Sequence, residues 1–257
     1  MQQSTHDIDA LLQESHSLDT RDFIAWALAK FPNASFASSL GAEDQALLWL
    51  LQEAHAPVAV FSLDTGRLPE ETYDLLQKNR EFFSLPIQVY APEAAAVEAL
   101  VASGGPNLFY DSLAKRQACC AVRKVAPLRR ALAGRDAWFT GMRRGQSSTR
   151  AGLQRIEWDA ANGLVKLNPL IDWSHQDVWD LIERHELPYN AQHDKGYPSL
   201  GCAPCNRADK PGEDERSGRW WWENPEHKEC GLHVHGDAPS AAPRKAIGGI
   251  GSLQGKF

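Results

Sequence analysis

The sequence lacks the long apolar segment that a membrane-spanning helix requires. No uninterrupted apolar run among the 257 residues approaches the roughly 18 residues needed to cross a bilayer. The first ten residues also lack a basic region followed by an apolar stretch, the pattern that begins a secretory signal. We therefore expect a cytoplasmic protein without a membrane partner. Hydrophobic residues at 43% and charged residues at 23% are ordinary values for a globular chain.

Cysteine is scarce, since only five cysteines occur. A reducing cytoplasm disfavours structural disulfides, so these thiols are expected to bind metal or to react. Cys202 and Cys205 have the two-residue spacing of zinc ribbons and iron–sulfur proteins, whereas Cys119 and Cys120 are adjacent. Adjacent side chains diverge, so they reach a bulky cluster more easily than one zinc ion. The pattern favours an iron–sulfur cluster, with structural zinc or a redox dithiol at Cys202 and Cys205 as alternatives.

The fifth cysteine, Cys230, stands apart from these two pairs. His227, Lys228 and His233 surround it in the sequence, and Gly231 follows it. Nearby cationic side chains favour the thiolate, which is the nucleophilic form of cysteine, and glycine allows the backbone to move. Cys230 is therefore a candidate nucleophile. An inert thiol near the end of the chain is the alternative.

Positive charge is concentrated in one stretch. Residues 115–150 contain ten basic residues and one acidic residue, although the whole chain carries a net charge of −6. A local positive field on an acidic protein suits a small anionic ligand in a cleft better than a long polyanion such as duplex nucleic acid. We therefore expect an anionic small-molecule ligand and no nucleic-acid partner.

Short apolar runs alternate with helical patterns along the first half of the chain. After one or two N-terminal helices, the pattern predicts strands near 34–37, 58–61 and 87–90, each followed by a helix, near 43–54, 69–83 and 92–102. Continuous apolar strands that alternate with helices indicate an α/β fold, a mostly parallel sheet with helices on both faces. Ligands of such sheets bind beyond the carboxyl ends of the strands, which here places segments 38–43 and 64–67 at the site.

The second half of the chain is less regular. We expect a helix from about 118 to 132, a strand at 137–140 and a helix that begins at the capping box of Ser174 and Asp177. Regular periodicity fades after Leu187. We predict a single α/β domain over residues 1–233, with a catalytic tail segment from about 210, and a disordered extension over residues 234–257.

Together these motifs resemble the assimilatory adenylyl-sulfate (APS) reductases over roughly residues 35–233. The resemblance rests on the Asp64-Thr65-Gly66 turn, on both cysteine pairs and on the C-terminal motifs. The C-terminal motifs are residues 187–190, 196–197 and 201–205, Arg216, Gly218, Arg219, the tryptophans at 220–222 and residues 228–233. In that family the fold is of the adenine nucleotide alpha hydrolase type. The resemblance implies a 4Fe-4S cluster bound by Cys119, Cys120, Cys202 and Cys205.

The family also implies a reaction and a set of substrate contacts. Cys230 is expected to attack the sulfur of adenosine 5′-phosphosulfate, releasing AMP and leaving an S-sulfocysteine that a thioredoxin- or glutaredoxin-type reductant resolves to sulfite. Segment 38–44 resembles the modified phosphate loop of these reductases, which argues against ATP pyrophosphatase activity; Leu40 stands where many relatives have serine. The expected substrate-binding residues are Ser38, Gly41, Glu43, Leu63, Asp64, Thr65, Gly66, Arg123, Lys124, Arg150, Arg216, Arg219 and His233.

Two other functions fit parts of the same pattern. A phosphoadenylyl-sulfate (PAPS) reductase uses the same terminal cysteine but lacks the cluster, so the presence of both cysteine pairs favours the APS enzyme. A zinc-bearing binding module without catalytic turnover is the second alternative. The sequence leaves the oligomeric state open, and a homo-oligomer is compatible with it.

Overall fold

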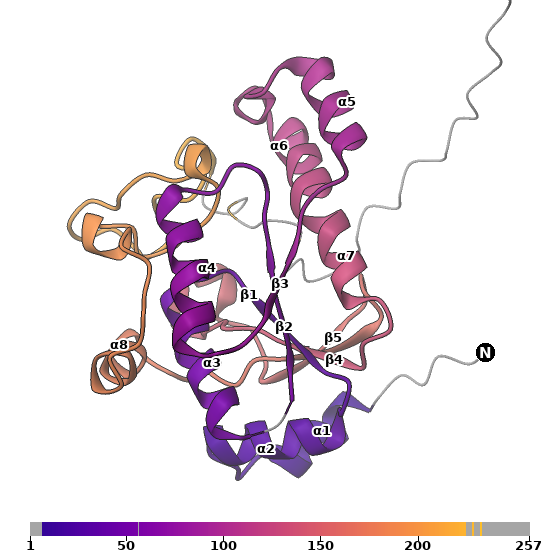
Figure 1. The fold of residues 1–257 in the computed structure, drawn as a ribbon, viewed down its shortest axis with the longest axis vertical. Helices are drawn as coiled ribbons and strands as arrows, with labels where there is room; N and C mark the ends of the chain where they lie inside the picture. The colour runs from indigo at the N-terminus through magenta and orange to yellow at the C-terminus, as the bar shows by residue number, and fades with distance from the viewer. Residues whose placement is uncertain (1–6, 56, 225–227, 229–231, 233–257) are drawn as a thin grey trace, which may run out of the picture.

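The computed structural model describes residues 7–55, 57–224, 228 and 232. Strands and helices alternate through the first half of the chain, as the apolar runs predict (Figure 1). The elements are α1 (Ile8–Ser15), α2 (Thr20–Lys30), β1 (Ser35–Ser38), α3 (Ala42–Glu53), β2 (Ala59–Leu63), α4 (Glu70–Phe82), β3 (Ile87–Tyr90) and α5 (Ala94–Gly104). One or two N-terminal helices and three strand–helix units were expected; two N-terminal helices and all three units are present.

The predicted α/β fold is confirmed, and its sheet has six strands in the order β3-β2-β1-β4-β6-β5. Strand β1 pairs in parallel with β2 on one side and with β4 (Ala137–Phe139) on the other. The chain therefore reverses its direction of winding beside β1. In open α/β sheets, ligands bind at such a switch point, beyond the carboxyl ends of the strands.

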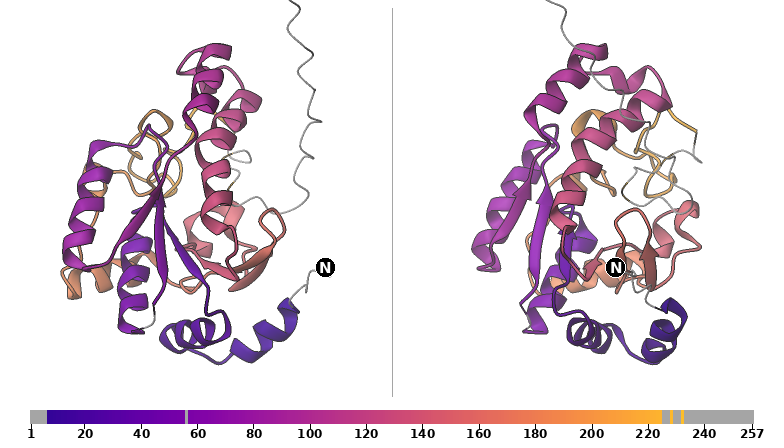
Figure 2. Two further views of the ribbon diagram at one scale, coloured as in Figure 1. Left: turned by 45° about the vertical axis from the view of Figure 1, so that its right-hand side comes forward. Right: turned by 90° about the vertical axis from the view of Figure 1, so that its right-hand side faces the viewer.

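Helices cover both faces of the sheet (Figure 2). Phe36 and Phe139 face a large core shared with α1, α2, α3 and α8 (His175–Arg184). Phe61 and Trp138 face a second, smaller core, where they pack against Leu128 of α7 (Ala126–Leu132). The two cores arise because successive residues of a strand point to opposite faces, and both faces must be shielded from water.

Sequence patterning did not predict the hairpin at one edge of the sheet. β5 (Ile156–Asp159) and β6 (Leu164–Leu167) pair antiparallel, and β6 also pairs in parallel with β4. The turn between them is closed by Asp159, whose side chain accepts hydrogen bonds from Asn162, and by Gly163 at φ 71°. Four-residue strands are too short to give a clear period-2 signal, so only the turn residues mark this hairpin.

The helix that carries the first cysteine pair begins earlier than the sequence pattern predicts. A short 3-10 turn, η1 (Leu108–Tyr110), precedes α6 (Leu113–Cys120), and the Ser112 side chain caps α6 by accepting from the Lys115 amide. A π-helical turn, η2 (Ala121–Val125), then leads into α7. Pro127, in the first turn of α7, has no amide hydrogen for the α-helical pattern, which accounts for an irregular turn just before it.

The last described part of the chain is largely irregular. Ser174 and Asp177 form the expected capping box at the start of α8. Short 3-10 turns follow β4 and α8, namely η3 (Arg144–Gln146), η4 (Ser148–Arg150), η5 (His193–Lys195) and η6 (Ala203–Cys205). The predicted extension at 234–257 lies outside the described residues, so the domain boundaries remain a prediction. Over the described part of the chain, no helix is both long and apolar enough to cross a membrane.

Candidate active site

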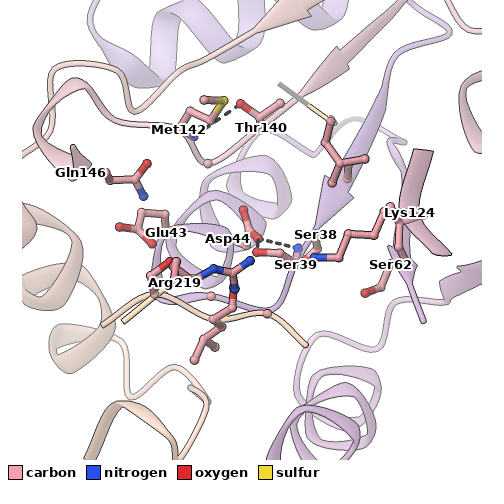
Figure 3. Close-up of a pocket in the computed structure, with 18 of the residues that line it drawn as sticks. Ser38, Ser39, Glu43, Asp44, Ser62, Lys124, Thr140, Met142, Gln146 and Arg219 are labelled. Carbon is pink, nitrogen blue, oxygen red and sulfur yellow. Dashed lines mark hydrogen bonds between the residues drawn. The ribbon is translucent and has the colours of Figure 1, made fainter. Parts of the chain in front are cut away.

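A pocket lies beyond the carboxyl ends of β1, β2 and β4, where the switch point of the sheet predicts a ligand (Figure 3). One wall comes from the strand ends and the loops that follow them, including Ser38, Ser39, Leu63, Thr65 and Thr140. The opposite wall comes from the irregular C-terminal part of the chain. It is formed by Pro198, Ser199, Leu200, Gly201, Glu215, Arg216, Arg219, Trp220 and Leu232.

The loop after β1 is tied to the first turn of α3 by Asp44. Its carboxylate accepts hydrogen bonds from the amide and the hydroxyl of Ser39, both at 2.6 Å. Burial raises the pKa of Asp44 to about 6, although the Ser39 hydrogen bonds oppose the shift. Ser38 and Gly41 also line the pocket, and Gly41 is the N-cap of α3. The expected contacts Ser38 and Gly41 thus lie at the pocket, and Ser39 and Asp44, which the sequence placed in this loop but did not name as contacts, line it as well.

Leu40 adopts a backbone conformation that is unusual for a branched residue. Its φ is 64°, and its amide donates to the Ser38 hydroxyl at 3.2 Å. The Leu40 side chain is only 1% exposed and is not among the residues that line the pocket. In this protein the side chain at that position therefore belongs to the packed interior and supplies no contact to the pocket.

At the Asp64-Thr65-Gly66 turn after β2, some residues line the pocket and others hold the turn in place. Leu63 and Thr65 line the pocket, whereas Asp64, Gly66 and Arg123 are not among the lining residues. Asp64 accepts from the Gly66 amide at 2.7 Å and from the Tyr73 hydroxyl at 2.8 Å. Gly66 has a φ of 68°, which glycine adopts without strain. Arg123 donates to the Thr65 carbonyl at 2.7 Å, so these residues hold the turn in place.

Four basic residues from distant parts of the sequence meet at this pocket. Lys124 follows the first cysteine pair, Arg150 comes from the loop after β4, and Arg216 and Arg219 come from the C-terminal wall. Arg150 contacts Gln146, and Arg219 contacts the Leu200 carbonyl. Figure 3 shows Lys124 and Arg219 directed toward the loop that contains Ser38 and Ser39. Their convergence creates a positive field suited to an anionic group.

A buried ion-pair network lies beside these cations, and the sequence pattern did not predict it. Arg143, which is 1% exposed in its side chain, pairs at 2.8 Å with both Glu43 and Glu215. Burial alone would raise the pKa of Glu43, but the charge and hydrogen bonds of Arg143 lower it below its usual range. These partners are 100 and 72 residues from Arg143 in the sequence. No local pattern could have identified them.

Four cysteines form a single cluster beside the pocket. Cys120, Cys202 and Cys205 are each 8% exposed and gather around Phe109 and Trp220, with Cys119 packed against them. The Cys202 sulfur lies 3.2 Å from the Thr65 hydroxyl. Cys119 and Cys120 end α6, Cys202 precedes η6 and Cys205 ends it, so the fold joins the two pairs that the sequence separates.

Cys202 and Cys205 share a hydrogen bond that moves the pKa values of the two thiols in opposite directions. The hydrogen bond from Cys205 lowers the pKa of Cys202 well below the usual value, burial opposes the shift, and Lys124, Thr65 and Arg219 reinforce it. The same hydrogen bond raises the pKa of Cys205, as does burial, and burial also raises the pKa of Cys119. Among the described residues, no three His, Cys, Asp or Glu side chains are grouped to hold one metal ion. The convergence of four thiols is nevertheless the donor set that a Cys-ligated iron–sulfur cluster uses.

Cys230 and His233 lie outside the described residues. Two neighbours in the sequence are described. The carbonyl of Lys228 accepts from Arg216 at 3.1 Å, and Leu232 lines the pocket and packs against the cysteine cluster. Of the described residues near Cys230 in the sequence, Leu232 therefore lies at the pocket, and Lys228 contacts an arginine that lines it.

The fold and site together define an α/β protein of the adenine nucleotide alpha hydrolase type, with a cation-lined pocket at the strand ends and four cysteines beside it. The family described as the phosphoadenosine phosphosulfate reductase domain matches residues 33–208, and the chain belongs to this family. The resemblance identified from the sequence motifs is thereby confirmed.

Curated relatives cover most of the chain. The adenosine 5′-phosphosulfate reductase of Allochromatium vinosum is 55% identical over 204 residues, which are 79% of this chain and 80% of the relative. The enzyme of the same name from Agrobacterium fabrum is 44% identical over 243 residues, 95% of this chain and 92% of the relative.

Solved structures support the fold. The phosphoadenylyl-sulfate reductase of Candida auris, in complex with phosphate, has a TM-score of 0.68 at 27% identity and covers 79% of this chain and 98% of its own. Yeast FAD synthetase has a TM-score of 0.53 at 17% identity over 81% of this chain and 70% of its own, a likeness of fold alone.

Proposed function

We propose that the protein reduces adenosine 5′-phosphosulfate to sulfite and AMP in assimilatory sulfate reduction. The observation that carries this proposal is the convergence of four basic side chains on one pocket at the strand ends, with a four-cysteine cluster directly beside it. Relatives that are 44% to 55% identical over most of their length are named for this activity. The thiol-rich site is suited to the reducing cytoplasm, where we expect the protein to act.

The pocket suggests how the substrate would be oriented. Leu63 and Thr65 would border the adenosine, together with the turn that Asp64, Gly66 and Arg123 support. The N-terminus of α3, at the end of segment 38–43, would receive an anionic oxygen, because the first amides of a helix have no carbonyl partner within it. The phosphosulfate would lie among the four pocket cations. These are Lys124, Arg150, Arg216 and Arg219.

The chemical step we infer uses Cys230 as the nucleophile. Its thiolate attacks the sulfur of the substrate, the sulfur–oxygen bond to AMP breaks, and AMP leaves with that electron pair, helped by the pocket cations. A thioredoxin- or glutaredoxin-type dithiol then attacks the Cys230 sulfur of the S-sulfocysteine and releases sulfite. The second thiol of the reductant resolves the mixed disulfide, so the dithiol supplies both electrons. His233 would assist in binding the substrate anion.

We infer that Cys119, Cys120, Cys202 and Cys205 bind a 4Fe-4S cluster. Four thiols are the usual ligand set of such a cluster. The charges of Lys124 and Arg219 act to lower the pKa of both Cys202 and Cys205, and so favour the thiolate form that ligates iron.

Lys124 would connect the cluster site with the substrate site. It lines the pocket, and its charge also acts on the Cys202 thiol. When bound, the cluster would contribute a compact charged group beside this lysine. The position of Lys124 between the two sites supports a mainly electrostatic contribution of the cluster to substrate binding.

Two measurements test this proposal. Purified protein is assayed for sulfite release with thioredoxin and either adenosine 5′-phosphosulfate or its 3′-phosphorylated form. We expect a clear preference for the former; the opposite preference would establish the PAPS reductase alternative. Anaerobic purification should give a brown protein that contains iron and acid-labile sulfide. A colourless protein that contains zinc and releases no sulfite would support the binding-module alternative.

A further inference from the structure

Segment 215–223 forms part of the pocket wall and has one ion pair at each end. Arg216 and Arg219 lie within it and line the pocket, and Trp220 contacts both the pocket and the cysteine cluster. The structure describes every residue of this segment, and none of them belongs to a helix or a strand. Its one sheet-like contact is the isolated bridge between Asn206 and Arg219. Two backbone hydrogen bonds join it to the neighbouring loop, from Arg207 to the Gly218 carbonyl at 3.1 Å and from Trp220 to the Cys205 carbonyl at 3.0 Å. The two ion pairs at its ends join it to the helices.

The first end is attached to the helix that begins at the phosphate loop. Glu215 pairs with Arg143 at 2.8 Å, and the same nitrogen of Arg143 lies 2.8 Å from Glu43 in the first turn of α3. Arg143 is buried, and its Nε also donates to Glu43 at 3.0 Å. The guanidinium thus joins segment 215–223 to α3.

The second end is attached to the helix that carries the first cysteine pair. Glu223 receives two hydrogen bonds from Arg116 of α6, from Nε at 3.0 Å and from Nη2 at 2.8 Å. The side chains are 1% and 8% exposed, so water screens this pair little. A two-point contact between guanidinium and carboxylate fixes orientation as well as distance. Burial would lower the pKa of Arg116, but Glu223 and the Cys120 sulfur raise it above its usual value.

Between the two ends, Trp220 has a backbone conformation that is unfavourable for a residue other than glycine. Trp220 has a φ of 40° although it is fully buried, and its amide donates to the Cys205 carbonyl at 3.0 Å. The guanidinium carbons of Arg116 and Arg219 lie 4.7 and 4.6 Å from the centre of the Trp220 ring. A left-handed backbone at a tryptophan costs free energy, so the surrounding contacts must impose it. The hydrogen bond to Cys205 and the two guanidinium groups over the ring act on Trp220 directly, and the two ion pairs fix the ends of the segment on either side of it.

We propose that Glu215 and Glu223 are positioning residues that fix segment 215–223 at its two ends and so hold Arg216 and Arg219 in the pocket. Glu215 ties the segment to the phosphate-loop helix, and Glu223 ties it to the cysteine-bearing helix. The two ends have different neighbours, so their loss has different consequences. The inference rests on the proposed function only for the identity of the nucleotide, and its test does not require turnover.

The test compares three variants of the full-length, anaerobically purified protein. These are Glu215→Gln, Glu223→Gln and the control Glu213→Gln. The control removes the same charge from Glu213, a nearby carboxylate that pairs with Arg207. Arg207 is itself part of the irregular C-terminal chain, and both side chains of this pair are about 30% exposed. Hydrogen exchange of peptides that cover residues 215–223, affinity for AMP and iron content are measured for each.

We expect Glu215→Gln to speed exchange around residues 215–219 by about tenfold and to weaken AMP binding by about tenfold, with iron content unchanged. The sign of the binding change is decisive. Loss of a negative charge beside an anion site would by itself strengthen AMP binding, so weaker binding reports misplaced Arg216 and Arg219. For Glu223→Gln we expect faster exchange around residues 220–223 and lower iron retention, with AMP affinity within about twofold of the parent protein.

Unchanged exchange in both Glu215→Gln and Glu223→Gln, or equal changes in the Glu213→Gln control, would overturn the proposal, as would tighter AMP binding in Glu215→Gln.

Glu223→Gln leaves Arg116 buried without its carboxylate and can impair folding. Glu223→Asp is therefore included, because it keeps the charge but shortens the reach. We expect it to fold and to exchange faster than the parent around residues 220–223; parental exchange in this variant would also contradict the proposal. Failure to reduce adenosine 5′-phosphosulfate would instead reject the proposed function and leave these results standing.

Discussion

The two walls of the pocket are built by different means. The strand-end wall is part of the sheet, where Ser38 pairs with Ser62 in the parallel register and the Thr140 amide donates to the Leu167 carbonyl at 2.9 Å. The C-terminal wall consists of residues 198–201 and 215–220 together with Leu232, and side-chain pairs attach it to the helices. One wall is fixed by the continuous hydrogen-bond ladder of a sheet, and the other by isolated backbone hydrogen bonds together with a few buried ion pairs.

This difference separates stability from function. Moving the strand-end wall breaks the ladder of the sheet and the cores on both of its faces, so damage there should lower the free energy of unfolding. Moving the C-terminal wall breaks ion pairs and a few isolated backbone hydrogen bonds while the sheet remains intact. Damage there should mainly affect binding and chemistry. The predictions below test this division, in order of decreasing expected effect.

The largest effect is expected at Cys230, in the chain that continues the C-terminal wall. Cys230→Ser replaces the thiolate with a hydroxyl that is not ionised at neutral pH, so sulfite release should fall by at least about 1,000-fold. Iron content, melting temperature and AMP affinity should remain those of the parent. Mass spectrometry should detect no sulfonated enzyme after incubation with the substrate. Sulfite release at the parental rate would show that another residue is the nucleophile.

Cys202 connects the two walls, because its sulfur contacts Thr65 of the strand-end wall and packs with Trp220 of the other. If Cys202 binds a cluster, Cys202→Ala should lose most of the iron and lower the melting temperature by several degrees, since metal ligation couples distant segments. Iron analysis and thermal unfolding measure both. Full iron content in this variant would contradict the proposed ligand set.

The same division explains how far the sequence could predict this protein. The strand-end loops were expected from local patterns, because an apolar run, a small-residue turn and a leucine-rich helix such as α3 are all encoded within about fifteen residues. The turn at Asp64 was found in the same way. These features depend on neighbours in the sequence.

The C-terminal wall could be predicted only in part. Motif resemblance identified Arg216 and Arg219 as substrate-binding candidates, and both line the pocket. The buried partners Arg143 with Glu215 and Arg116 with Glu223 were missed, because each pair joins residues 72 or 107 positions apart. In the sequence, Arg116 and Arg143 look like any other charges of the basic stretch. Only tertiary packing distinguishes a buried guanidinium from an exposed one.

Gly141 offers a test of the strand-end wall. A Cβ at this position would lie 3.0 Å from the Glu43 Cβ and 3.2 Å from the Glu43 carbonyl carbon, and would also overlap the Asp44 carboxylate. Much of this obstacle is helix backbone, which cannot move without shifting α3. Gly141→Ala should therefore lower the free energy of unfolding by about 1–3 kcal/mol, as measured by denaturant titration. Gly152→Ala, where a Cβ meets nothing within 4 Å, is the matched control and should change stability little.

Gly201 is the matching position in the C-terminal wall. A Cβ there would overlap the guanidinium of Arg219, which is the end of a flexible side chain rather than backbone. The side chain can move aside at small cost to the fold, but it then leaves its position over Trp220 and in the pocket. We expect Gly201→Ala to weaken AMP binding by about tenfold, which is about 1.4 kcal/mol, while the unfolding free energy changes less than in Gly141→Ala. Calorimetric titration with AMP and denaturant unfolding of both variants measure the two quantities. If Gly201→Ala lost more stability than Gly141→Ala and bound AMP normally, the C-terminal wall would be a structural part of the fold rather than an adjustable part of the site.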